Sequence, residues 1–243
     1  MCFNSTTSIV AFAVSLICSA YLFYNGKKND NKSDVFFSVI VLLIGCMQLI
    51  EYFLWNNQDC GGTKNHMFSL SIMLLLTLQG IVGCSVYYYL YPSNRFIDNS
   101  FIMLYFFAYA CFFIYLMQYL NKFKLCSKPS ETSCRLKWAP YTTLAQNNLP
   151  ALIIHLIFYA AAGAIIFFET IHTNLADVFK YKCRYAALPL IFILSVIYII
   201  CREINNAFRL LSNPFMFLDY FDVFGSIFCF SAVFLGIVSV LHI

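Results

Sequence analysis

The chain has 243 residues, of which 61% are hydrophobic and 11% charged, and its formal net charge is +4. A soluble domain carries about 25% charged residues and could not bury this much apolar surface, so a water-soluble fold is excluded. The basic residues fall in short loops and not on one face or in a tail, which argues against nucleic-acid binding.

Seven apolar segments are long enough to cross a bilayer as helices, because a hydrocarbon core of about 30 Å needs roughly 20 helical residues. They cover residues 7–24, 35–55, 67–91, 100–120, 151–168, 185–201 and 222–241. Most connections are short, so consecutive helices should run antiparallel. The sequence therefore predicts an all-α, polytopic transmembrane bundle of about seven helices, forming one domain over residues 1–243.

The orientation follows from the Lys and Arg residues of the short loops, which the positive-inside rule places on the cytoplasmic side. Loops after the first, third and fifth segments carry Lys27, Lys28, Lys32, Arg95, Lys180, Lys182 and Arg184, whereas the opposite short loops carry Lys64, Arg202 and Arg209. A long loop over residues 121–150 is set aside, because long loops translocate largely regardless of charge. We expect the N-terminus outside, the C-terminus inside, and this loop outside as a partly structured flap.

Three of the 11 cysteines, Cys60, Cys126 and Cys134, lie in the expected outer loops. An oxidising compartment on that side would allow disulfides. We expect Cys60 to pair with Cys126 or Cys134. The alternative, in which all three stay reduced, remains open because connectivity is not readable from a sequence.

The second segment carries the clearest candidate site. Gln48, Glu51 and Trp55 recur at helical spacing and share one face. An ionisable side chain within a span is costly in hydrocarbon and usually faces the bundle interior. Glu51 should lie about one turn below the outer surface, and His155 of the fifth segment close to the same level at 1.5 Å per residue.

Further polar side chains lie in the expected outer third or near the middle of a span. Gln118 ends the fourth segment, Glu203, Asp219 and Asp222 flank the last two, and Gln79 lies centrally in the third beside two glycines. Together with Glu51 they could line a proton or cation pathway. The structural alternative is that the acidic residues simply reach the headgroups and that Gln79 marks close helix packing.

Other functional classes find no support in the motifs. The four histidines are dispersed, without a metal-binding pair four residues apart, and no nucleophile elbow or phosphate-binding loop is present. We therefore expect no enzyme, metal site or cofactor. The last segment also lacks the lysine that a retinal-binding protein requires.

The segment 47–55, with Cys60 and then Gln79 in the next span, resembles a group of uncharacterised multi-span proteins of large DNA viruses and protists. The resemblance implies a shared seven-helix membrane architecture and brings no activity with it. Gln48, Glu51 and Trp55 are its most recognisable positions.

Three functions remain open at this point. The first is a channel-like or transporter-like protein for protons or small cations, with Glu51 as the principal group. The second is a structural or assembly component, in a virion membrane or as an accessory subunit of a membrane complex. The third is a seven-helix receptor that binds through the long loop. In each case we expect the partners to be the lipid bilayer and further copies of the chain or other membrane subunits. The sequence does not indicate which cellular or viral membrane contains the protein.

Overall fold

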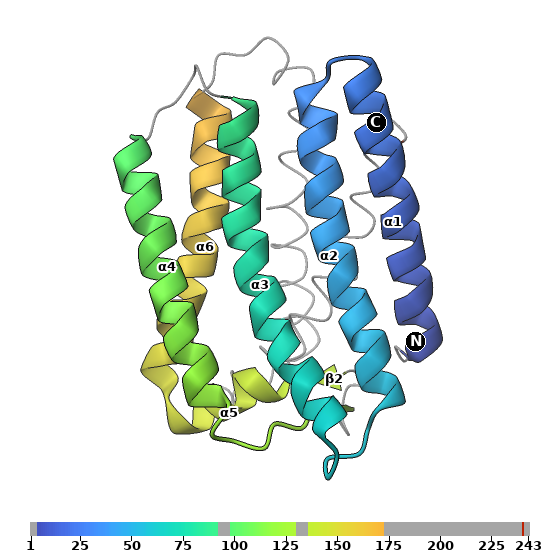
Figure 1. Cartoon of the computed structure of the whole chain (residues 1–243), viewed down its shortest axis with the longest axis vertical. Coiled ribbons are helices and arrows are strands. Elements are labelled where there is room, and N and C mark those ends of the chain that lie inside the picture. Colours follow the sequence, from blue (N-terminus) through green and yellow to red (C-terminus); the bar gives the residue numbers. More distant parts are fainter. Residues whose placement is uncertain (1–3, 92–97, 130–135, 173–239, 241–243) are drawn as a thin grey trace, which may run out of the picture.

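A computed structural model describes residues 4–91, 98–129, 136–172 and 240. The expected spans 185–201 and 222–241, together with Cys134, Glu203, Asp219 and Asp222, lie outside the described residues, apart from residue 240 itself. The described part is a mostly helical bundle (Figure 1). The predicted all-α class is thereby confirmed for this part of the chain.

Within the described residues, four helices are long and apolar enough to cross a membrane, and they mark a membrane protein. They are α1 (Ser5–Lys28), α2 (Lys32–Asn56), α3 (Thr63–Leu90) and α4 (Asn99–Leu120). A further long helix, α6 (Leu149–His172), is apolar over Leu149–Ile165. Each contains or closely matches an expected span, and for α1, α2 and α4 the polar residues that end the apolar runs also cap the helices.

Capping by asparagine and aspartate sets the beginnings of three of these helices. Asn4, Asn31 and Asp98 accept hydrogen bonds from backbone N–H groups in the first turns of α1, α2 and α4. Between α1 and α2 the chain reverses within a few residues. Asp30 adopts a φ of 51°, and the Asn31 N–H donates to the Gly26 carbonyl at 2.8 Å, which closes α1 as a Schellman motif.

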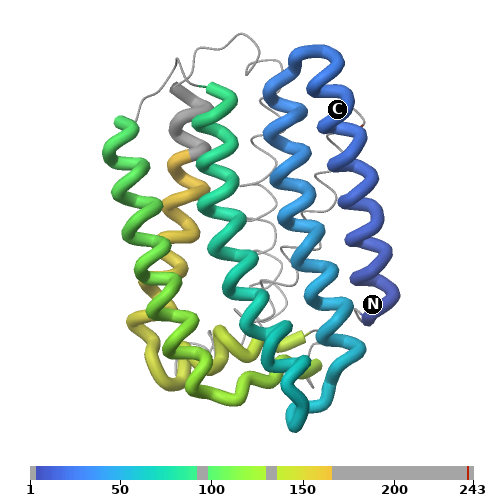
Figure 2. Tube along the Cα trace, viewed as in Figure 1, coloured from blue at the N-terminus to red at the C-terminus, as the bar shows by residue number. Residues whose placement is uncertain are grey.

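Helices α1 and α2 pack closely along their whole length. A Cβ on Gly45 of α2 would lie 2.5 Å from the Cβ of Ser15, and Ser19 Oγ donates to the Ser38 carbonyl at 2.7 Å. Small side chains let two membrane helices approach and exchange such hydrogen bonds. In Figure 2 the two helices run side by side, and the beginning of α1 lies at the same end of the bundle as the connection between α2 and α3.

The described residues of the segment expected as a long loop, 121–129 and 136–150, are folded across one end of the bundle. They contain the antiparallel strands β1 (Lys128–Pro129) and β2 (Leu136–Lys137), then the helix α5 (Ala139–Asn147) and the first residues of α6. Leu125, Leu136, Trp138 and Leu144 are all at most 1% exposed. We call residues 125–129 and 136–147 the cap, because Figure 1 shows them closing the end of the bundle where α2 ends and α3 begins.

Candidate functional site

Glu51 lies beneath the cap. Its position five residues before the end of α2 places it about one and a half turns inside the bundle. The side chain is 1% exposed, and the Trp138 indole Nε1 donates a hydrogen bond to Glu51 Oε1 at 3.3 Å. A buried carboxyl group needs such donors to offset the loss of water. Sequence reasoning found Glu51 but not Trp138, which lies 87 residues away in a segment expected to be loop.

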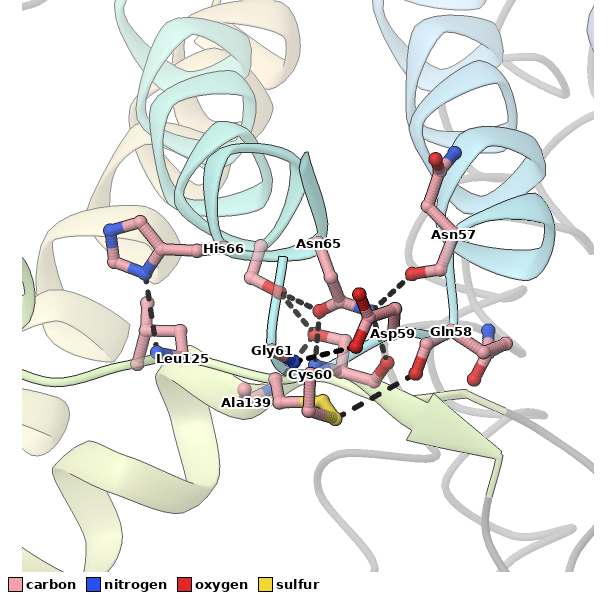
Figure 3. The surroundings of a disulfide bond; sticks show 12 residues. Asn57, Gln58, Asp59, Cys60, Gly61, Asn65, His66, Leu125 and Ala139 are labelled. Atoms are coloured by element: carbon pink, nitrogen blue, oxygen red, sulfur yellow. Dashed lines mark hydrogen bonds between the residues drawn. A yellow bond between two sulfur atoms is a disulfide. The ribbon is translucent and has the colours of Figure 1, made fainter. Parts of the chain in front are cut away.

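A disulfide joins the cap to the connection between α2 and α3. It links Cys60 with Cys126 (Figure 3). This is one of the two pairings expected from the sequence, and it is confirmed. The link ties the first residues of the cap to the end of α2, the helix that carries Glu51.

Asn65, in the first turn of α3, holds the same part of the cap by side-chain hydrogen bonds. Its Nδ2 donates to the Asn57 carbonyl at 2.7 Å and to the Ser127 carbonyl at 3.0 Å. Its Oδ1 accepts from the Ser127 backbone N–H at 2.8 Å. The carboxamide thus pairs with Ser127 as a neighbouring strand would, and both residues are fully buried (Figure 3).

Three further contacts hold the same part of the cap. His66 Nδ1 accepts from the Leu125 backbone N–H at 3.2 Å. Ser127 Oγ, which lies 2.8 Å from Ser69 Oγ, accepts from the Ala139 N–H at 3.0 Å, so the beginning of α5 is held too. These polar residues at a helix end gave no functional signal in the sequence, because serine and asparagine are ordinary there.

His155 and Gln48 form the second part of the site, and we call their side chains the polar layer. Both are 0% exposed. Neither ring nitrogen of His155 and neither polar atom of the Gln48 carboxamide has a hydrogen-bond partner within the described part of the chain. Most buried polar atoms are satisfied, and an unsatisfied one costs about 1–3 kcal/mol. These four atoms are among several such buried atoms, which also include the hydroxyl oxygens of Ser8 and Ser33 elsewhere in the bundle.

The depths of these groups can be compared through Gln79 of α3. Its Nε2 donates to the Leu43 carbonyl of α2 at 3.2 Å, and its Oε1 accepts from Tyr159 Oη of α6 at 3.0 Å. From this shared level, Gln48 lies five residues and His155 four residues nearer the cap, about 7.5 and 6 Å at 1.5 Å per residue. The two side chains thus lie at nearly the same depth, and Glu51 lies about 5 Å nearer the cap by the same rise.

Aromatic rings connect the cap to the polar layer. The Trp138 and Tyr141 ring centroids are 6.0 Å apart, and those of Tyr141 and His155 are 6.2 Å apart in an edge arrangement. On its other side His155 lies 6.0 Å from the ring of Tyr109, whose hydroxyl is beside Thr77. Glu51 and His155, from helices separated by α3, are therefore linked through side chains of the cap.

Gln79 has a packing role in the structure. Both ends of its carboxamide are hydrogen bonded, and a Cβ on the adjacent Gly80 would lie 3.2 Å from Ala162 Cβ of α6. This matches the structural alternative for a central amide beside small residues. The contact closes the bundle on the side of the polar layer that faces away from the cap.

Two other predicted site residues, Gln118 and Trp55, lie within the described part of the chain. Gln118 is exposed on α4, so the structure does not bring it to Glu51, and Trp55 is half-buried beside the core of the cap end. Within the described ranges no group of three or more His, Cys, Asp or Glu side chains could hold a metal ion. Comparisons with protein-family models, curated proteins and solved structures found no match.

Proposed function

We propose that the protein crosses the membrane seven times, with its N-terminus and cap outside, and moves protons or small cations along a path through Glu51. The orientation is supported by the Cys60–Cys126 disulfide, since disulfides persist in oxidising compartments. Lys27, Lys28 and Lys32 lie at the opposite end, but Lys64, Lys122, Lys124, Lys128 and Lys137 lie at the cap end, so the orientation rests on the disulfide.

One observation carries the transport proposal. A buried carboxyl group, Glu51, lies one helical turn from the Gln48 carboxamide on α2 and at a similar depth to His155 of α6, and the four polar atoms of these two side chains have no partner among the described residues. Polar and ionisable groups inside a membrane bundle are expensive and usually belong to a pathway for ions or protons. A bundle selected only for stability would fill these positions with apolar side chains.

The test is ion flux into liposomes that contain the purified protein, measured over a range of pH for the wild type and Glu51→Gln. Glutamine keeps an oxygen that can accept the Trp138 hydrogen bond, so the fold should survive. We expect flux to fall about tenfold or more, as for loss of a proton-transfer group. Asp59→Asn is the matched control, because Asp59 is an exposed carboxyl group at the same end of the bundle. Normal flux through Glu51→Gln would contradict the assignment.

A structural or assembly role is the second candidate, and α4 favours it. Only five of its 22 residues are buried, and Phe101, Met103, Leu104 and Phe107 are each more than half exposed. Such a face suits lipid or another membrane subunit. Absence of flux in the wild type, together with fixed partners that copurify in mild detergent, would establish this role in place of transport.

A further inference from the structure

We infer that the polar layer is an internal proton site, with His155 as the group that exchanges protons with Glu51, and that the proton rather than a metal cation is the carried species. This inference rests on the proposed function. It adds the identity of the species and the role of a second residue.

The hydrogen-bonding inventory of the polar layer fits water and a mobile proton. The Gln48 carboxamide offers donors and an acceptor, and a neutral imidazole offers one donor and one acceptor. All four atoms are buried and without partners among the described residues. Buried water requires two to four hydrogen bonds for each molecule, and these unpaired atoms offer donors and acceptors for them. Hydrogen-bonded water between two titratable side chains conducts protons.

The same inventory is poor for a metal cation. Hard cations that have shed their water take about six oxygen ligands. The oxygen atoms that Gln48 and the neighbouring Thr77 and Tyr109 could offer as metal ligands are uncharged, and His155 could offer only nitrogen. The carboxyl group of Glu51 already accepts the Trp138 N–H on Oε1. Hydrogen bonding, and not metal coordination, is the chemistry that these side chains are arranged to perform.

The step is a simple proton transfer. The Glu51 carboxyl O–H bond breaks and an N–H bond forms on the His155 imidazole, across bound water beside Gln48, which leaves a carboxylate and an imidazolium ion. Tyr109 of α4 and Tyr141 of α5 are the titratable groups packed against His155 within the described residues. Beyond His155 the Gln79–Tyr159 hydrogen bond closes the layer, so this contact is where onward transfer must be controlled.

The experiment compares proton flux with Na⁺ and K⁺ flux in liposomes, for the full chain and for His155→Asn. Asparagine keeps a donor and an acceptor but cannot carry a proton. We expect wild-type proton flux that is the same in Na⁺, K⁺ or a bulky organic cation, and a loss of about tenfold or more in His155→Asn. Asp59→Asn is again the control and should stay within about twofold of wild type, since Asp59 is exposed and lies outside the polar layer.

Correct folding is monitored by formation of the Cys60–Cys126 disulfide on a non-reducing gel, and His155→Gln replaces His155→Asn should the first variant fail to fold. Proton flux undiminished in a folded His155 variant overturns the inference. Flux of Na⁺ or K⁺ that requires Glu51, without proton flux, overturns it while leaving the proposed function standing. No flux of any ion overturns both.

Discussion

Replacing Asn65 with alanine should detach the beginning of the cap. The side chain makes three hydrogen bonds with backbone groups of Asn57 and Ser127, all in a buried position. Hydrogen bonds between membrane helices average about 0.6 kcal/mol, and buried ones in soluble proteins about 1 kcal/mol. Because alanine also leaves the Ser127 N–H without its acceptor, we expect the free energy of unfolding to fall by about 2–3 kcal/mol.

The assay is reversible unfolding in mixed micelles, with hydrogen exchange of the Ser127 amide as a local probe. Asn147→Ala is the matched control, because Asn147 donates to Thr143 of its own helix at an exposed position, and a loss below about 0.5 kcal/mol is expected there. A loss below about 1 kcal/mol for Asn65→Ala, with unchanged exchange at Ser127, would refute the view that this carboxamide holds the cap.

Two further substitutions test the attachment of the cap and the packing of α1 on α2. Cys60→Ser should lower the free energy of unfolding by about 2–4 kcal/mol, because the disulfide closes a long loop with a sequence separation of 66. The same loss on reduction of the wild type would show that the missing disulfide is the cause. Equal stability of the oxidised and reduced wild type would contradict it. Gly45→Ala should cost about 1–3 kcal/mol, since its Cβ would meet Ser15, whereas Gly163→Ala, with open space around it, should be neutral or stabilising. Both are measured by the same unfolding assay, and equal effects of the two glycine substitutions would argue against close contact of α1 with α2.

The sequence was informative wherever the cost of polarity in lipid decides the structure. Charged and capping residues mark the ends of α1 to α4, so their bounds could be predicted within a few residues. The same cost predicts that Glu51 turns inward, and it is 1% exposed. Cys60 could be expected to pair with Cys126 or Cys134, because all three lie in expected outer loops, and the structure forms the first of these two pairs.

The sequence did not predict the rotation of a helix that apolar residues surround, nor contacts between segments far apart in the chain. Aromatic and aliphatic side chains cover every face of α4, so the pattern does not indicate its rotation, and Gln118, expected at the outer end of the span as a possible pathway residue, is exposed. Trp138 lies in a segment whose composition indicated a loop. Its insertion over Glu51 depends on the folding of the cap, which local patterns do not encode.

Under the proposed function, the cap must let protons pass and must also stay attached to the bundle. Trp138 and Tyr141 are buried between the outer end of the bundle and the pair Glu51 and His155, so protons from outside must pass these rings. Yet the disulfide and Asn65 fasten the cap at its beginning, beside α3, and α5 is held as well, at its first residue by Ser127 Oγ and at its last by the hydrogen bond from Tyr119 Oη to the Asn147 carbonyl. A cap fastened at these points can admit water by a local movement of the Trp138 side chain while the rest stays attached. Transport would then depend on the Trp138–Glu51 hydrogen bond breaking and re-forming, and the stability of the bundle on contacts that this movement leaves intact.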